Sequence, residues 1–93
     1  MRIKLMNDYT VELPLWGDEG LLDDDVSLVS EELERQLRAW ASNFNEHFSW
    51  ETGWPSAEME SAHRVEGERL FVELQAALPR DDVTFQYWEK GHQ

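Results

Sequence analysis

Two neighbouring stretches of this chain repeat apolar residues every three or four positions, which is the spacing of one face of an α-helix. In the first stretch the steps are four, three, four and four residues, at Leu33, Leu37, Trp40, Phe44 and Phe48. Ser30 precedes this stretch, and acidic residues directly follow Ser30, as expected at the N-terminus of a helix. We therefore predict a helix over about residues 31–48, with one side buried.

The second stretch shows a similar pattern and ends before Pro79. Its apolar and small residues on one face are Met59, Ala62, Gly67, Leu70, Phe71, Leu74, Ala77 and Leu78. Ser56 is a candidate N-cap, and the position before a proline disfavours helical geometry, so we predict a helix over 56–78. A glycine inside a helix costs about 1 kcal/mol relative to alanine. We therefore expect another element, such as the Trp40 ring, to approach Gly67 closely.

Segments with alternating apolar residues lie near both ends of the chain and predict strands over 2–6 and 83–88. Residues 9–16 also alternate, but Pro14 cannot donate to a sheet, so this segment is either an edge strand or an irregular arm. We expect the terminal strands to pair and an antiparallel helix hairpin to cover one face of the sheet. The predicted fold is a single α+β domain over residues 1–93, with a two- or three-stranded sheet whose strand direction stays open.

Negative charge is concentrated in one segment of this chain of 93 residues, whose formal net charge is −12. Residues 8–34 contain ten acidic residues and no Lys or Arg, whereas the other 66 residues contain ten acidic and eight basic residues. Such a chain should not bind nucleic acid or anionic lipid directly, because the phosphate groups would repel it. A basic protein or a cation is the expected kind of partner.

Several classes of site are excluded or unsupported by the residue types present. The chain has no cysteine, which excludes disulfides, thiolate zinc sites and cysteine nucleophiles. The three histidines, His47, His63 and His92, form no zinc-binding spacing, and we expect each to be partly buried or at the surface. No serine lies in a nucleophile elbow. We therefore expect no enzymatic activity, no catalytic residues, no metal site and no cofactor.

The beginning of the chain is not a secretory signal, and no apolar run approaches the roughly 20 residues that a membrane helix needs. We therefore expect a cytoplasmic protein.

The sequence resembles a group of small acidic bacterial proteins over nearly its whole length. In that group a Leu-x-x-Asp-Tyr-Gly opening and a Pro-Leu-Trp segment precede a helix with a central Trp and a second helix with a Glu-Gly pair. The corresponding residues here are Leu5, Asp8, Tyr9, Pro14, Leu15, Trp16, Trp40, Glu66 and Gly67. Thr10 stands where the group usually has Gly, and the acidic loop and the inter-helix connection look shorter. The resemblance implies no activity, but in size and charge these proteins resemble the immunity proteins that accompany bacterial toxins.

Our leading hypothesis is a protein-interaction module that neutralises a basic partner, for example a nuclease toxin, because an acidic surface speeds association with a basic active site. The residues that we expect to bind the partner electrostatically are Asp18, Glu19, Asp23, Asp24, Asp25, Glu31 and Glu32. Trp50 and Trp54, in the connection between the helices, either cap the helix pair or anchor the partner, since tryptophan is enriched at binding hot spots.

Three alternatives stay open. The chain could mimic DNA and inhibit a nucleic-acid-binding protein, which would require acidic residues spaced like phosphates. The loop that contains Asp18 and Asp23 could bind calcium weakly, although it lacks the ligand spacing of an EF-hand. The domain could also be a plain dimerisation module. The oligomeric state is not determined by the sequence.

Overall fold

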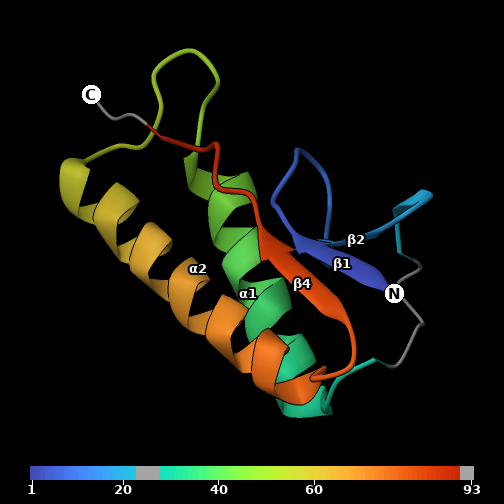
Figure 1. Ribbon diagram of the computed structural model, residues 1–93. Helices are drawn as coiled ribbons and strands as arrows, with labels where there is room; N and C mark the ends of the chain where they lie inside the picture. The colour runs from blue at the N-terminus through green and yellow to red at the C-terminus, as the bar shows by residue number, and fades with distance from the viewer. Residues whose placement is uncertain (23–27, 91–93) are drawn as a thin grey trace.

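The computed structural model of the protein describes residues 1–22 and 28–90. These residues form an α+β fold in which two long helices lie side by side against a mixed sheet (Figure 1). The elements in chain order are β1 (Arg2–Leu5), β2 (Leu15–Gly17), β3 (Gly20–Leu21), α1 (Glu31–His47), α2 (Ala57–Ala77) and β4 (Asp82–Phe85). The predicted fold class is therefore confirmed.

Both helices begin at the serine that the sequence indicates. The Ser30 side chain accepts a hydrogen bond from the backbone N–H of Leu33, and Ser56 accepts one from Met59, each at 3.2 Å. Each bond satisfies one of the N–H groups that have no partner inside the first turn of a helix. The helices end one residue earlier than predicted, at His47 and Ala77.

The terminal strands pair as expected, and the structure determines their direction. β1 and β4 are parallel, with Ile3 opposite Val83 and Leu5 opposite Phe85. Parallel neighbours need a long crossover connection, and the helix pair forms part of the chain that supplies it here. The predicted strand over 83–88 is shorter in the structure, because the chain leaves the sheet after Phe85.

The sheet contains one strand more than we predicted, in the order β3-β2-β1-β4. Residues 9–16, for which an edge strand and an irregular arm were both open, are mostly irregular, and pairing with β1 begins only at Leu15. Thr10 has a φ of +66°, a left-handed conformation that breaks a strand. We did not predict the short hairpin of β2 and β3, whose turn ends at Gly20 with a φ of +116°.

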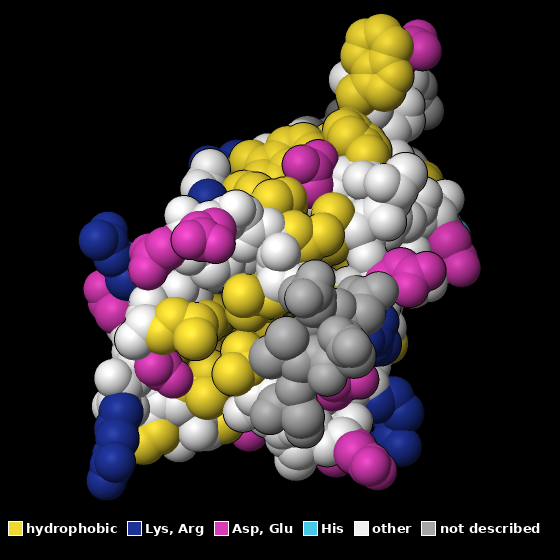
Figure 2. Space-filling view, turned by 90° about the vertical axis from the view of Figure 1, so that its right-hand side faces the viewer, with side chains coloured by type: hydrophobic (Ala, Val, Ile, Leu, Met, Phe, Trp, Pro, Cys, Tyr) yellow, Lys and Arg dark blue, Asp and Glu magenta, His cyan; other side chains and the backbone are white. Residues whose placement is uncertain are grey.

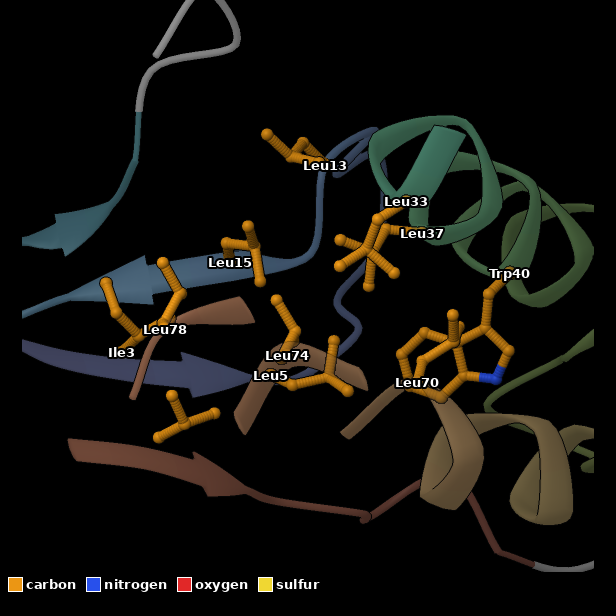
Figure 3. Close-up of a cluster of buried hydrophobic side chains, with 11 residues drawn as sticks. Ile3, Leu5, Leu13, Leu15, Leu33, Leu37, Trp40, Leu70, Leu74 and Leu78 are labelled. Carbon is orange, nitrogen blue, oxygen red and sulfur yellow. The ribbon is translucent and has the colours of Figure 1, made fainter. Parts of the chain in front are cut away.

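The hydrophobic core lies between the sheet and the two helices, as Figure 3 shows. It is made of Ile3, Leu5, Leu13, Leu15, Leu33, Leu37, Trp40, Leu70, Leu74, Leu78 and Val83. Gly67 of α2 faces this core, and a Cβ atom built on it would lie 2.6 Å from Cζ2 of Trp40. The predicted close approach of the Trp40 ring is thus confirmed, since no side chain could fit there without displacing it.

Within the described part of the chain, neither helix is long and apolar enough to cross a membrane.

Candidate partner-binding surface

The connection between α1 and α2 forms a loop that extends beyond the ends of the helices and is closed by backbone hydrogen bonds (Figure 1). Ser49 and Gly53 exchange two backbone hydrogen bonds, of 3.1 and 2.7 Å, and close a three-residue turn. Gly53 has a φ of +76°, a conformation that glycine adopts at little cost. The Ser49 hydroxyl also accepts a hydrogen bond from the backbone N–H of Glu51. This geometry holds Trp50 at the tip, where 77% of the residue is exposed.

Trp54, the second expected anchor, is completely buried, so it has no surface with which to contact a partner. Its ring packs against His63 at 4.5 Å and against Phe48 at 5.7 Å between centroids. Its indole N–H donates to the carbonyl of Glu89 at 3.0 Å. The expected binding role of Trp54 is therefore corrected. Trp54 instead fixes the base of the loop that presents Trp50.

A buried polar cluster lies beside Trp54 and joins three distant parts of the chain. Asn7 donates to a carboxylate oxygen of Glu89 at 2.7 Å, and His63 Nε2 lies 3.2 Å from the same oxygen. The backbone N–H of Trp88 donates to the other oxygen of Glu89. Asn7, His63 and Glu89 are at most 1% exposed. The expectation that His63 is partly buried or at the surface is therefore wrong, because the ring is held in the interior between Trp40 and Trp54.

His63 and Glu89 lie close enough for proton transfer, and a general acid or base must lie within hydrogen-bond reach of the group it serves. Neither side chain has exposed surface in the described structure. The cluster instead satisfies buried polar groups and ties β1, α2 and the segment after β4 together.

Tyr87, close to this cluster, has a hydroxyl group that is buried and makes no hydrogen bond within the described part of the chain. Burial raises the pKa of Tyr87 well above its usual range, and the nearby charges of Glu60 and Glu89 raise it further. The phenol therefore stays neutral in the folded protein.

Partly exposed aromatic side chains extend the surface near the base of the loop. Tyr9 is 41% exposed, and its ring centroid lies 5.4 Å from that of Phe44 and 6.4 Å from that of Phe48. Trp88 meets Tyr9 edge-on at 5.7 Å. The C-terminal end of α1 is thus covered by aromatic rings, of which Tyr9 is the most exposed to solvent.

Three exposed carboxylates lie at this end of the helix pair. Glu46 lies in the last turn of α1, Glu58 in the first turn of α2 and Glu51 beside Trp50, and all three residues are exposed. Glu46 also lines a groove of about 620 Å³ between α1 and the Thr10 turn. Sequence analysis missed these three residues because they lie outside the segment of highest charge. The antiparallel helix pair could have indicated them, since it brings the end of one predicted helix beside the start of the next.

The acidic residues that we expected to bind a partner lie elsewhere. Asp18 and Glu19 are exposed in the β2–β3 turn, and Glu31 and Glu32 are exposed in the first turn of α1. Asp23, Asp24 and Asp25 lie outside the described residues. Because α1 has 17 residues at about 1.5 Å each, its first turn and the Trp50 loop are about 25 Å apart. The structure therefore does not bring Trp50 together with Glu31 and Glu32.

Hydrogen bonds that involve the Glu66–Arg69 pair and Trp16 link elements of the fold. Glu66 accepts two hydrogen bonds from Arg69, which also donates to Gln36 of α1 at 2.7 Å and so links the helices. These bonds hold the pKa of Glu66 below its usual range. The indole N–H of Trp16 donates to the carbonyl of Met6, which fastens β2 to the end of β1.

A metal site is not indicated in the part of the chain that the structure describes, because no three metal-ligating side chains gather there.

A family model described as "Serratia CdiI immunity protein-like" matches residues 1–90, a range that includes every described helix and strand. No curated protein matches the chain.

Proposed function

The chain belongs to the Serratia CdiI immunity protein-like family, and we propose that it binds and neutralises a basic toxin of a contact-dependent inhibition system, acting by binding and not by catalysis. The family match over residues 1–90 is the observation that carries this proposal. The net charge of −12 adds the chemistry of the partner, because a strongly acidic protein associates fastest with a basic one.

A nuclease is the toxin class that this charge fits best. The active site of a nuclease attracts phosphate groups, so it presents positive charge. An acidic protein that covers such a site pairs with those charges and keeps the nucleic acid out. We propose that the residues that steer this encounter are Asp18, Glu19, Asp23, Asp24, Asp25, Glu31 and Glu32.

Co-expression tests the function directly. The toxic domain of a contact-dependent inhibition system from the source genome is produced in a host cell with and without the chain, and growth is measured. We expect growth only when the chain is present, and a complex that weakens as salt rises from about 50 to about 500 mM because exposed charges are screened. Growth arrest in the presence of the chain, or no complex at low salt, would contradict the proposal.

A matched pair of charge variants tests the steering residues. Asp18→Asn with Glu19→Gln removes two charges from the β2–β3 turn, and Glu68→Gln with Glu73→Gln removes two from exposed positions of α2. We expect the first pair to slow association by about threefold or more at low salt and the second pair to have a smaller effect. Equal effects would show that only net charge matters.

The two other binding hypotheses have their own tests. Duplex DNA should compete with a DNA mimic for any basic nucleic-acid-binding protein, whereas a toxin inhibitor should prefer its toxin. Calorimetry with millimolar calcium tests the cation-binding hypothesis, which concerns Asp18 and the three aspartates outside the described residues.

A further inference from the structure

We propose that the loop over residues 49–53 is a preformed anchor whose Trp50 side chain inserts into an apolar pocket of the basic protein partner. The carboxylates of Glu46, Glu51 and Glu58 would pair with basic side chains around that pocket. The identity of the partner as a toxin rests on the proposed function. The anchor itself rests on the geometry of the loop.

Trp50 differs from the other four tryptophans of the chain in its hydrogen bonding. Each of those four donates its indole N–H to a backbone carbonyl: Trp16 to Met6, Trp40 to His63, Trp54 to Glu89 and Trp88 to Asn7. Within the described residues the indole N–H of Trp50 has no such acceptor. Its ring therefore offers both an apolar body and a polar donor to another molecule, which suits a binding hot spot.

The loop holds Trp50 away from the interior of the protein. The base of the loop packs through Trp54, which is fully buried, and the two bonds between Ser49 and Gly53 close the turn above it. Figure 2 shows the same loop as a projection at the top of the molecule, with a hydrophobic and an acidic side chain at its tip. A loop whose backbone is already closed by hydrogen bonds loses little conformational freedom on binding, which favours affinity.

The negative charge around Trp50 favours a basic protein as the binding partner of the loop. Glu46, Glu51 and Glu58 are exposed at this end of the helix pair, and a second copy of the chain would bring another net charge of −12 against it. Anionic lipid would be repelled for the same reason. A basic protein gains from the carboxylates and can bury the roughly 150–250 Å² of a large aromatic side chain.

Neighbouring features give the partner a surface larger than one residue. Tyr9 is 41% exposed and packs on Phe48, two residues before Trp50. The groove of about 620 Å³ that Glu46 lines lies along the same end of α1. A protruding anchor beside a partly exposed ring and a polar groove resembles the arrangement of hot spot and rim at protein interfaces.

The test measures binding of the full chain to the toxic domain by calorimetry for the wild type, Trp50→Ala, Trp50→Phe and the control Val72→Ala. Val72 is 61% exposed on α2, so both alanine variants remove exposed apolar surface. We expect Trp50→Ala to weaken binding about 30-fold or more, as at a hot spot. Trp50→Phe should keep part of the affinity, and Val72→Ala should change it less than about threefold. Thermal melting should be unchanged in all variants.

The outcomes separate this inference from the proposed function. If the wild type binds the toxic domain and Trp50→Ala binds equally well, the anchor is wrong and the function stands. If the wild type does not bind, both are wrong. Sedimentation of the chain alone and its binding to neutral and anionic vesicles complete the test. If the chain forms a dimer or binds vesicles and Trp50→Ala abolishes that association, the loop binds a second copy of the chain or a membrane, and the inference is overturned.

Discussion

At the scale of single residues, Thr10 is held in a conformation that its side chain disfavours. Its φ of +66° lies in the left-handed region, where a β-branched residue is strained by about 1–2 kcal/mol. Asn45 explains why the turn persists, because its side chain accepts from the Thr10 N–H and donates to the carbonyl of Val11. Glycine adopts this conformation at little cost, so it would relieve the strain.

We therefore expect Thr10→Gly to raise the free energy of unfolding by about 0.5–1 kcal/mol, after the larger conformational entropy of glycine in the unfolded chain is subtracted. Urea denaturation at neutral pH measures the change. Thr10→Ala is the control, since alanine keeps most of the strain and should give a smaller gain. A loss of stability in Thr10→Gly would mean that the threonine side chain makes a contribution larger than its strain.

Tyr87 allows a prediction about pH. Because burial raises the pKa of Tyr87, the phenol ionises more readily in the unfolded chain than in the folded one. The pKa difference therefore leaves the stability of the protein unchanged below the usual tyrosine pKa of about 10 and lowers it as pH rises above that value, because the unfolded chain releases the proton first. Tyr87→Phe has no such group, so the variant should lose less stability than the wild type between about pH 9 and pH 11.

The same variant also removes a buried hydroxyl that has no partner among the described residues. We expect Tyr87→Phe to raise the free energy of unfolding at pH 7 by about 1 kcal/mol, because the cost of desolvating an unpaired polar group disappears. Urea denaturation at pH 7 and over the range from about pH 9 to pH 11 checks the two predictions for Tyr87→Phe. A variant that is less stable at pH 7 would indicate that the hydroxyl has a hydrogen-bond partner.

At the scale of elements, the contact between α1 and α2 depends on the missing side chain of Gly67. A Cβ atom there would lie 2.6 Å from the Trp40 ring and 2.9 Å from Cζ of Phe85, so a rigid ring from α1 and another from β4 would both have to move. Alanine gains about 1 kcal/mol of helix propensity, but overpacking a core costs about 1–3 kcal/mol.

We expect Gly67→Ala to lower the free energy of unfolding by about 1–2 kcal/mol in spite of its better helix propensity. The control is Ser61→Ala, at an exposed position of the same helix, which should be neutral or slightly stabilising. Thermal and urea unfolding measure both variants. Stabilisation by Gly67→Ala would show that the helices can separate at little cost.

The segment after β4 is fastened to the other elements by Glu89. Its carboxylate accepts from Asn7, two residues after β1, and from the backbone of Trp88, and it faces His63 of α2. Removing the Glu89 carboxylate would leave its buried partners without a hydrogen-bond acceptor. Breaking a buried charged pair in this way typically costs about 3–5 kcal/mol.

We expect Glu89→Ala to destabilise the protein by about 3–5 kcal/mol, a large part of the total for a small domain. Lys90→Ala, at the exposed neighbouring position, is the matched control and should change stability by less than about 0.5 kcal/mol. Circular dichroism during urea titration measures both. Equal, small effects would mean that the buried cluster contributes little to stability.

At the scale of the whole molecule, the net charge of −12 is confined to a body whose principal extents are 39 × 22 × 21 Å. The screening length is about 30 Å at 0.01 M salt and about 8 Å at 0.15 M. At low salt most acidic residues therefore repel one another across the molecule, whereas at physiological salt only close neighbours do.

We expect the melting temperature to rise by roughly 5 °C when sodium chloride is raised from about 10 to about 300 mM, because screening removes self-repulsion. Replacing Asp23, Asp24 and Asp25 by asparagine removes three negative charges and changes the net charge from −12 to −9. The melting temperature of this variant should therefore rise less with salt. Scanning calorimetry measures the effect. A melting temperature that falls with salt would show that favourable ion pairs outweigh the repulsion.

The sequence by itself determined the features that depend on neighbouring residues. The helices and their serine N-caps follow from periodicity and local backbone chemistry, and the terminal strands follow from alternation. The helix-propensity cost of Gly67 also indicated that another element approaches it closely. The acidic segment is also visible in the sequence, and its role in binding stays a prediction.

Only the tertiary structure decided the features that join residues far apart in the chain. Asn7 meets His63 and Glu89 across 56 and 82 positions, and no local pattern encodes such a pairing. Trp50 and Trp54 are four residues apart in one connection, yet one is 77% exposed and the other is fully buried. The physical reason is that burial depends on which distant groups, here the carbonyl of Glu89 and the ring of His63, are present to receive a side chain.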